Sequence, residues 1–189
     1  MNPLIVQLRS LANLLLRTKR RYVILGGLAV SIYGEPRLTR DIDINIILGK
    51  FEINSFLKDA RKYGFSTASS ESRSIAERTG VLALKFKKGK TTGSCDIIMA
   101  ENPLEYASIE RGRPKKIYSI KARLITPEDL IIHKITSSRP RDAEDLKGIL
   151  IRQKGKLDIK YIEGWLKKID TADKNANLLG LFKALLREL

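Results

Sequence analysis

The sequence has almost no cysteine or histidine. Its 189 residues include one of each, Cys95 and His133. A single cysteine excludes a disulfide framework and a cysteine-rich zinc site, and a single histidine excludes a multi-histidine metal site within one chain. It also disfavours a Ser-His-Asp catalytic arrangement. Any metal ion held by this chain would therefore be bound by carboxylates, which favours a hard ion such as Mg²⁺ or Mn²⁺.

Acidic residues are also scarce. The chain has 21 Asp and Glu residues against 36 Lys and Arg residues, which gives a net charge of +15 and a pI near 10.0. No acid occurs before Glu35. Such an excess favours phosphate-rich partners such as nucleic acid, nucleotides or anionic lipid. Basic composition is equally a general property of proteins from ribosome-rich or hot cytoplasms, so charge alone leaves both explanations open.

Long hydrophobic runs are missing too. No apolar segment approaches the roughly 18 residues that span a bilayer. The apolar N-terminus contains Arg9 and no small-residue cleavage site, which is not typical of a signal peptide. We therefore expect a cytoplasmic protein with no membrane partner. Because 43% of the residues are hydrophobic, the chain can form one compact domain with or without a small helical extension.

Residue spacing predicts a mixture of helices and strands in the first two thirds of the chain and helices alone in the last third. In the first part we expect helices and strands in mixed order: helices 3–18, 28–33 and 51–63, and strands 22–25, 41–48, 81–87, 94–99 and 115–125. The second part is predicted to be entirely helical, with helices 127–138, 141–152, 158–169 and 174–188. This order predicts an α+β fold with a helical C-terminal part.

Three features of the first part point to phosphate chemistry. Gly26 and Gly27 end a strand, and glycines at a strand–helix turn let backbone N–H groups approach a phosphate. Asp41 and Asp43 lie two residues apart on a strand, so both carboxylates share one face. Asp96, on a later strand, would supply a third carboxylate for a metal site that stays open to water and phosphate. Together they are the parts that metal-assisted phosphoryl or nucleotidyl transfer requires.

Each feature has an ordinary structural explanation when it stands alone. A Gly-Gly pair after a strand is most often a plain turn, and an Asp-x-Asp on an amphipathic strand is often a solvated face. The run from Arg111 to Arg123 contains six basic residues and no acid, and it is either a solvated loop or a polynucleotide footprint. The argument therefore depends on the order and spacing of Gly26, Asp41 and Asp96 along the chain.

The segment GGLAVSIYGEPRLTRDIDI resembles the first motif of the nucleotidyltransferase superfamily with the DNA-polymerase-beta-like fold. That motif has a glycine pair or Gly-Ser, a short helix and then Asp-x-Asp. Downstream, LITPEDLIIHKITSSRPRDAEDL resembles the nucleotidyltransferase toxins of abortive-infection toxin–antitoxin systems. The resemblance covers about residues 22–150 and implies a mixed sheet flanked by helices. It divides the chain into a catalytic domain, 1–125, and a helical region, 126–189, that completes the active-site cleft.

The resemblance assigns roles to individual residues. It implies that Gly26 and Gly27 contact the triphosphate of an NTP, and that Asp41 and Asp43 bind Mg²⁺ or Mn²⁺. Asp96 would join them in binding the metal and act as a base toward the acceptor hydroxyl. The chain departs from the small antitoxin-type members, which carry Gly-Ser where it has Gly26-Gly27.

Further residues are implied to bind the nucleotide. Arg37 and Thr39 would line the entrance, Lys134 would contact phosphate as a catalytic residue, and Arg141 and Asp142 would complete the set. Lys134 is equally explained as a lysine whose stem lies along the core edge with its ammonium in solvent. Asp142 is equally explained as an acid in the first turn of a helix.

The function predicted from the sequence is metal-dependent transfer of NMP from an NTP to an acceptor hydroxyl. The net charge of +15 favours an RNA acceptor such as tRNA over a small molecule or a protein. Two further classes remain as alternatives: a non-catalytic nucleotide or RNA binder, and a toxin subunit that acts with an antitoxin partner protein. The three aspartates argue against a non-catalytic binder, since such a protein has little need of three clustered carboxylates.

Overall fold

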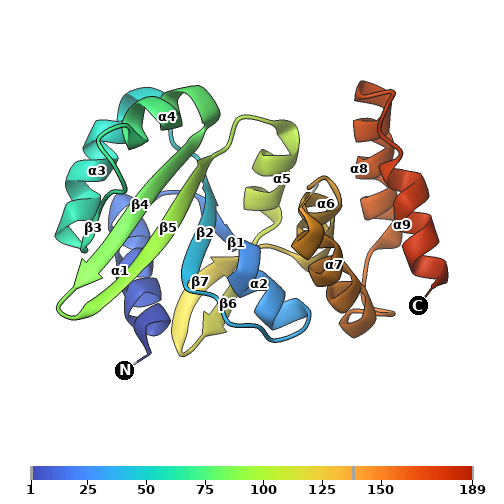
Figure 1. The fold of residues 1–189 in the computed structure, drawn as a ribbon, viewed down its shortest axis with the longest axis horizontal. Helices are drawn as coiled ribbons and strands as arrows, with labels where there is room; N and C mark the ends of the chain where they lie inside the picture. Colours follow the sequence, from blue (N-terminus) through green and yellow to red (C-terminus); the bar gives the residue numbers. More distant parts are fainter. Residues whose placement is uncertain (1, 138, 189) are drawn as a thin grey trace. The chain divides into compact units, whose positions relative to one another are not determined.

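The protein contains one seven-stranded mixed sheet, and its C-terminal part is helical (Figure 1). The structure is a computed structural model that describes residues 2–137 and 139–188. The strand order across the sheet is β3-β4-β5-β2-β1-β7-β6. This architecture confirms the predicted α+β fold with a mixed sheet, flanking helices and a helical C-terminal part.

The strands all lie before residue 126, and most of the helices that follow them in the chain are amphipathic. The strands are β1 (Tyr22–Leu25), β2 (Asp41–Ile46), β3 (Phe65–Thr67), β4 (Val81–Lys88), β5 (Thr91–Met99), β6 (Arg113–Ile117) and β7 (Ile120–Leu124). The helices are α1 (Pro3–Thr18), α2 (Gly26–Tyr33), the 3-10 turn η1 (Lys50–Glu52), α3 (Ile53–Lys62), α4 (Ser72–Thr79), α5 (Pro103–Arg111), α6 (Pro127–Ile135), α7 (Pro140–Arg152), α8 (Ile159–Ala172) and α9 (Leu178–Arg187).

Contacts within the chain define two compact units. The first comprises Met1–Leu28 and Leu38–Ile125 and contains the whole sheet, and the second comprises Ala29–Arg37 and Thr126–Leu189. Helix α2 begins in the first unit and ends in the second, so the segment that leads from the glycine turn to β2 belongs to the helical unit.

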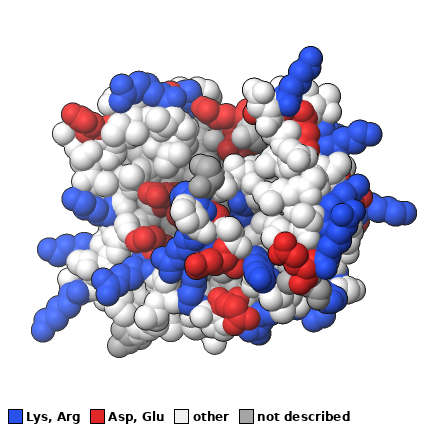
Figure 2. Space-filling view, turned by 45° about the vertical axis from the view of Figure 1, so that its right-hand side comes forward, with Lys and Arg blue, Asp and Glu red and all other residues white. Residues whose placement is uncertain are grey.

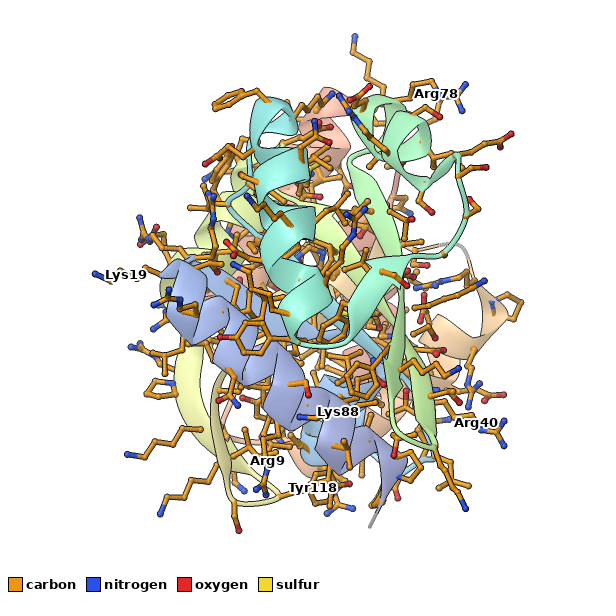
Figure 3. The ribbon with its side chains drawn as sticks, turned by 90° about the vertical axis from the view of Figure 1, so that its left-hand side faces the viewer. Arg9, Lys19, Arg40, Arg78, Lys88 and Tyr118 are labelled. Carbon is orange, nitrogen blue, oxygen red and sulfur yellow. The ribbon has the colours of Figure 1, made fainter. Side chains whose placement is uncertain are left out.

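In the first unit, alternation along β2 separates an apolar face from a polar one. Ile42, Ile44 and Ile46 are fully buried. Asp41 and Asp43 point to the opposite face because successive side chains of a strand alternate. Helix α1 covers the apolar face, where Gln7 lies directly beneath Gly93 of β5. Helix α3 lies beside α1 in Figure 3.

Helix α5 covers one end of the polar face. Asn45 of β2 is fully buried and donates a hydrogen bond from its side-chain amide to the carbonyl oxygen of Glu105 in α5, at 3.1 Å. This contact places α5 over the end of β2 that lies farthest from Asp41. The other end of the face, which carries the aspartates, is not covered by α5.

The second unit is organised by a buried carboxylate on α6. Asp129 has no exposed surface and accepts hydrogen bonds from the hydroxyls of Thr126, at 2.8 Å, and Tyr161, at 2.6 Å. Thr126 is also the N-cap of α6, and it accepts a hydrogen bond from the Asp129 backbone. These bonds tie the start of α6 to α8 and satisfy a charge that would otherwise be costly to bury.

The structure adds three elements that the sequence patterns did not predict, namely β3, α4 and α5. The first two are short, and a three-residue strand has no measurable alternation. Helix α5 did carry a readable signal: Asn102 and Glu105 form a capping box with Pro103 at the first turn. The predicted single strand at 115–125 is two strands, β6 and β7, that pair as a hairpin.

Most of the other predicted elements are confirmed within a few residues. Helix α6 ends at Ile135, before the predicted end at residue 138, which lies outside the described residues. Among the helices of residues 2–137 and 139–188, none is long and apolar enough to cross a membrane.

Replacing Tyr161 by Phe should destabilise the protein. The substitution removes the hydroxyl that donates to Asp129 and leaves a fully buried carboxylate short of one donor. The expected loss in the free energy of unfolding is about 1–3 kcal/mol, measured by urea denaturation. Tyr106→Phe, at an exposed position of α5, is the matched control and should cost less than about 0.5 kcal/mol. Equal stabilities of the two variants would show that Asp129 does not depend on Tyr161.

Candidate active site

Strand pairing brings the three predicted catalytic aspartates to one face of two neighbouring strands. β2 and β5 are parallel, and their register sets Asp41 opposite Ser94 and Asp43 opposite Asp96. Neighbouring strands of a sheet lie about 4.7–4.9 Å apart, so opposed side chains on one face are close neighbours. The sheet therefore brings together carboxylates that lie more than fifty positions apart in the chain.

Gly26 begins α2 directly after β1, and Asp43 lies against it. Gly26 has φ +64, in the left-handed region, and a Cβ at this position would overlap the Asp43 carboxylate. Both facts require glycine. The Asp43 carboxylate therefore lies at the N-terminus of α2, the end of a helix that attracts anions.

The Asp41 carboxylate accepts a hydrogen bond from the Ser94 hydroxyl of β5. Ser94 lies two residues before Asp96 on the same strand and shares its face. The structure gathers no three His, Cys, Asp or Glu side chains within residues 2–137 and 139–188 that could hold a metal ion. The donors that the sheet does bring together are carboxylate and hydroxyl oxygens, which suit Mg²⁺ or Mn²⁺ and not a softer metal.

The electrostatic environment of the aspartates raises the pKa of Asp96 and of its neighbour Cys95. Partial burial, and then the negative charge of Asp41, raise the pKa of Asp96. Burial, followed by the charges of Asp43, Asp96 and Asp41, raises the pKa of the Cys95 thiol well above its usual range. Cys95 is fully buried on the opposite face of β5, so it is an unreactive core residue. A cation bound between the aspartates would relieve their repulsion.

Thr39 precedes Asp41 and orders the backbone at the start of β2. Its hydroxyl donates to the Asp41 carbonyl oxygen at 3.1 Å. Arg37 belongs to the second unit, where its carbonyl oxygen accepts a hydrogen bond from the Ser31 hydroxyl at 2.9 Å.

Lys134 is neither solvent-exposed nor unpaired. Its side chain is 7% exposed, and its ammonium contacts both Asp142 and Asp145 of α7. The hydrogen bond to Asp145 is 2.8 Å long. The Arg37 guanidinium donates to the same Asp145 at 3.2 Å. We name Arg37, Lys134, Asp142 and Asp145 the charge cluster.

The Asp142 carboxylate pairs with more than one cationic side chain. Arg139 donates to it at 2.8 Å from the preceding turn. Burial tends to raise the pKa of Asp142, but the hydrogen bonds from Lys134, Ser137 and Arg139 and the charge of Lys134 outweigh burial, so the pKa lies below its ordinary value of 3.8. The side chain of Arg141, the residue before Asp142, is exposed.

Each unit thus contains a distinct part of the predicted site. The first brings together Gly26, Asp41, Asp43 and Asp96, and the second brings together Lys134, Asp142 and Arg37. Two residues beside these were not among the predicted site residues. Ser94 could have been found from its position two residues before Asp96 on one strand face. Asp145 belongs to the downstream motif that resembles the nucleotidyltransferase toxins, but no role was predicted for it.

Comparisons with known proteins find similarity in structure but not in sequence. No model of a known protein family matches the chain, and no curated protein matches it. One similar solved structure is an antigenic nucleotidyltransferase-like protein from Paracoccidioides brasiliensis, at 17% identity and a TM-score of 0.55, covering 98% of this chain and 91% of that one.

Two further similar structures are of proteins whose names refer to antibiotics. The antibiotic-resistance factor ANT(2'')-Ia is 13% identical with a TM-score of 0.52, and 93% of this chain and 97% of that one are covered. The lincosamide antibiotic adenylyltransferase LnuA, bound to lincomycin, is 18% identical with a TM-score of 0.46, and 76% of this chain and 94% of that one are covered. The similarity to the first structure, over nearly the whole of both chains, shows that this protein has the fold of nucleotidyltransferase-like proteins.

Proposed function

We propose that this protein is a metal-dependent nucleotidyltransferase that moves NMP from an NTP to an acceptor hydroxyl, with RNA such as tRNA as the favoured acceptor. The observation that carries the proposal is the pairing of Asp43 with Asp96 on one face of β2 and β5. Gly26 at the N-terminus of α2 contacts the same carboxylate group. These are the carboxylates and the anion-attracting helix end that phosphoryl chemistry uses.

The residues of the first unit suit separate roles in the reaction. The N-terminus of α2 at Gly26 and Gly27 would bind the triphosphate. Asp41, Asp43 and Asp96 would hold Mg²⁺ or Mn²⁺. A divalent ion bound there supplies charge neutralisation and polarises the phosphate. The acceptor oxygen would attack the α-phosphorus, the bond to the bridging oxygen would break, and pyrophosphate would leave. The acceptor proton would pass to the carboxylate of Asp96, acting as a general base.

Nucleotide-binding roles for Arg37, Thr39, Lys134, Arg141 and Asp142 remain predictions. An ammonium has three N–H donors, and in the charge cluster two carboxylates already accept from Lys134. A phosphate contact by Lys134 would therefore use its remaining donor. In this proposal Asp142 and Asp145 hold Lys134 and Arg37 in place. The nucleotide would accept hydrogen bonds from the N–H groups of these two cations that the aspartates leave unused.

The choice of RNA depends on the net charge of +15. Some basic residues of the acid-free stretch before Glu35 and of the run from Arg111 to Arg123 have structural partners. Arg20 pairs with Glu52 and Arg21 with Glu110, and Arg123 donates to backbone carbonyl oxygens, including that of Gly112 at 2.6 Å. Lys and Arg side chains are spread over the face drawn in Figure 2, with Asp and Glu among them, and do not form one patch there. An antitoxin protein remains a proposed partner.

A small-molecule acceptor is the second candidate. It is favoured by the similarity in fold to the antibiotic-resistance factor ANT(2'')-Ia. Incubating the protein with each labelled NTP, Mg²⁺ and either total RNA or a panel of small hydroxylated compounds separates the two. Label that moves with RNA supports the first proposal, and label found only on small molecules supports the second. No label on any acceptor would contradict both.

Replacing Asp43 by Asn should abolish most of the transfer activity without unfolding the protein. The change removes one negative charge from a group of repelling carboxylates, so the metal-free variant should melt at the same temperature as wild type or higher. Labelled-NTP transfer and thermal unfolding measure the two effects. Asp59→Asn, on the exposed surface of α3, serves as the control. Wild-type turnover by Asp43→Asn would show that the catalytic assignment is wrong.

Replacing Lys134 by Met should destabilise the protein strongly. The substitution leaves Asp142 and Asp145 buried, with Arg37 and Arg139 as the remaining cation partners among the described residues. Removing one partner of a buried ion pair costs about 3–5 kcal/mol in the free energy of unfolding, and urea denaturation measures it. Lys147→Met, at an exposed position of α7, should have little effect. An unchanged stability of Lys134→Met would mean that the ammonium does not lie between the two aspartates.

The stability of the charge cluster should depend on pH. Because the folded pKa of Asp142 lies below 3.8, its contribution is present at neutral pH and is lost as the pH falls below that value. Asp142→Asn should therefore be less stable than wild type at pH 7, and the difference should shrink as the pH falls toward and below 3.8. Unfolding free energies over this pH range measure it, with Glu144→Gln as the control. A difference independent of pH would contradict the assignment.

A further inference from the structure

The carboxylate face of the sheet continues from β5 onto β4, where it carries lysines. Lys85 lies opposite Ser94, and Lys87 lies opposite Thr92. Ser94 in turn lies opposite Asp41. Lys85, Ser94 and Asp41 therefore form one row across three strands. With neighbouring strands about 4.8 Å apart, the backbone of Lys85 is about 10 Å from that of Asp41.

This part of the face is open. Lys85, Lys87 and Thr92 are exposed and Ser94 is partly exposed, and neither lysine forms an ion pair with a residue that the structure describes. We name these four residues the β4 platform. It is distinct from the exposed surface of α1, which covers the opposite face: in Figure 3 Lys19, at the end of α1, projects to one side of the view and Arg40, next to Asp41, to the other.

Ala83 leaves space next to the third carboxylate. It lies opposite Asp96 in the register of β4 and β5 and on the same face. The methyl group of Ala83 fills little volume, so it leaves room for a ligand beside Asp96 on the side of β4. The next residues on that face of β4 are Lys85 and Lys87, about 6.8 Å apart at their backbones.

The order of the strands indicates on which side of the site each of the two substrates would bind. Gly26, at the turn into α2, follows β1, so the triphosphate end of the site lies on the β1 side of Asp43. Asp96 is on β5, on the other side of β2. In phosphoryl transfer the attacking and leaving oxygens lie in line on opposite sides of the phosphorus. An acceptor must therefore approach from the side of β5 and β4.

We propose that the β4 platform binds the acceptor, and that this acceptor is an RNA strand whose hydroxyl reaches Asp96 while its neighbouring phosphates contact Lys85 and Lys87. This inference rests on the proposed function and names the surface that selects its acceptor. Two lysines side by side on one strand face provide point charges at the spacing of successive contacts along a chain molecule. A small neutral acceptor would gain nothing from them.

Binding of fluorescein-labelled bulk tRNA tests the proposal independently of catalysis. Fluorescence anisotropy is measured over a series of salt concentrations in the Asp43→Asn background, without NTP. Lys85→Gln/Lys87→Gln should weaken binding about two- to thirtyfold and reduce the slope of log affinity against log salt by about 1.4. The matched double variant Lys160→Gln/Lys167→Gln, at exposed positions of α8, should bind like its parent.

Kinetics of the otherwise wild-type enzyme complete the test. Lys85→Gln/Lys87→Gln should raise the KM for RNA and leave the KM for NTP unchanged. If RNA is labelled but this variant behaves like wild type, the inference is overturned and the proposed function stands. If Lys115→Gln/Lys116→Gln on β6 weakens RNA binding in its place, the acceptor lies elsewhere and the inference is also overturned. If the wild type binds no tRNA at low salt, the platform does not bind RNA and the inference is overturned. The proposed function is then tested separately by NMP transfer to other acceptors.

Discussion

The parallel pairing of β2 with β5 is the interaction on which the candidate site depends. It sets Asp43 beside Asp96 and Asp41 beside Ser94. The pairing is held in register by the other face, where Ile42 and Ile44 pack against Cys95 and Ile97 in a fully buried layer. A slip of one residue would turn the isoleucines out and the aspartates in. Packing on one face of the sheet therefore fixes the chemistry on the other.

Each unit of the candidate site contains a group of carboxylates, and the two groups are in different environments. In the first unit the aspartates stay partly exposed, and partial burial, followed by the negative charge of Asp41, raises the pKa of Asp96. In the second, Asp142 and Asp145 are buried and receive Lys134 and Arg37. Repelling carboxylates at an open face suit the binding of a cation and phosphates, whereas a compensated buried group suits the fixing of helices.

The large positive charge has several uses in this molecule. Some cations hold the fold together: Arg123 donates to backbone carbonyl oxygens at the end of α5, and Arg20 pairs with Glu52. Others, such as Lys85 and Lys87, stand exposed on a sheet face that leads to the aspartates. The positive charge of this chain is therefore divided between cations that hold the fold together and cations that stay exposed on a sheet face.

The sequence by itself determined much of the fold and part of the site. Alternation in Asp41–Ile46 predicted which aspartates share a face, and helical spacing predicted α1 and α6 to α9, because these signals are local. It did not determine the partner of Lys134, which the pattern left at a core edge and the fold buries against Asp142. Nor did it give the row of Lys85, Ser94 and Asp41. Those contacts join residues far apart in the chain, and only the order and register of strands and the packing of helices decide them.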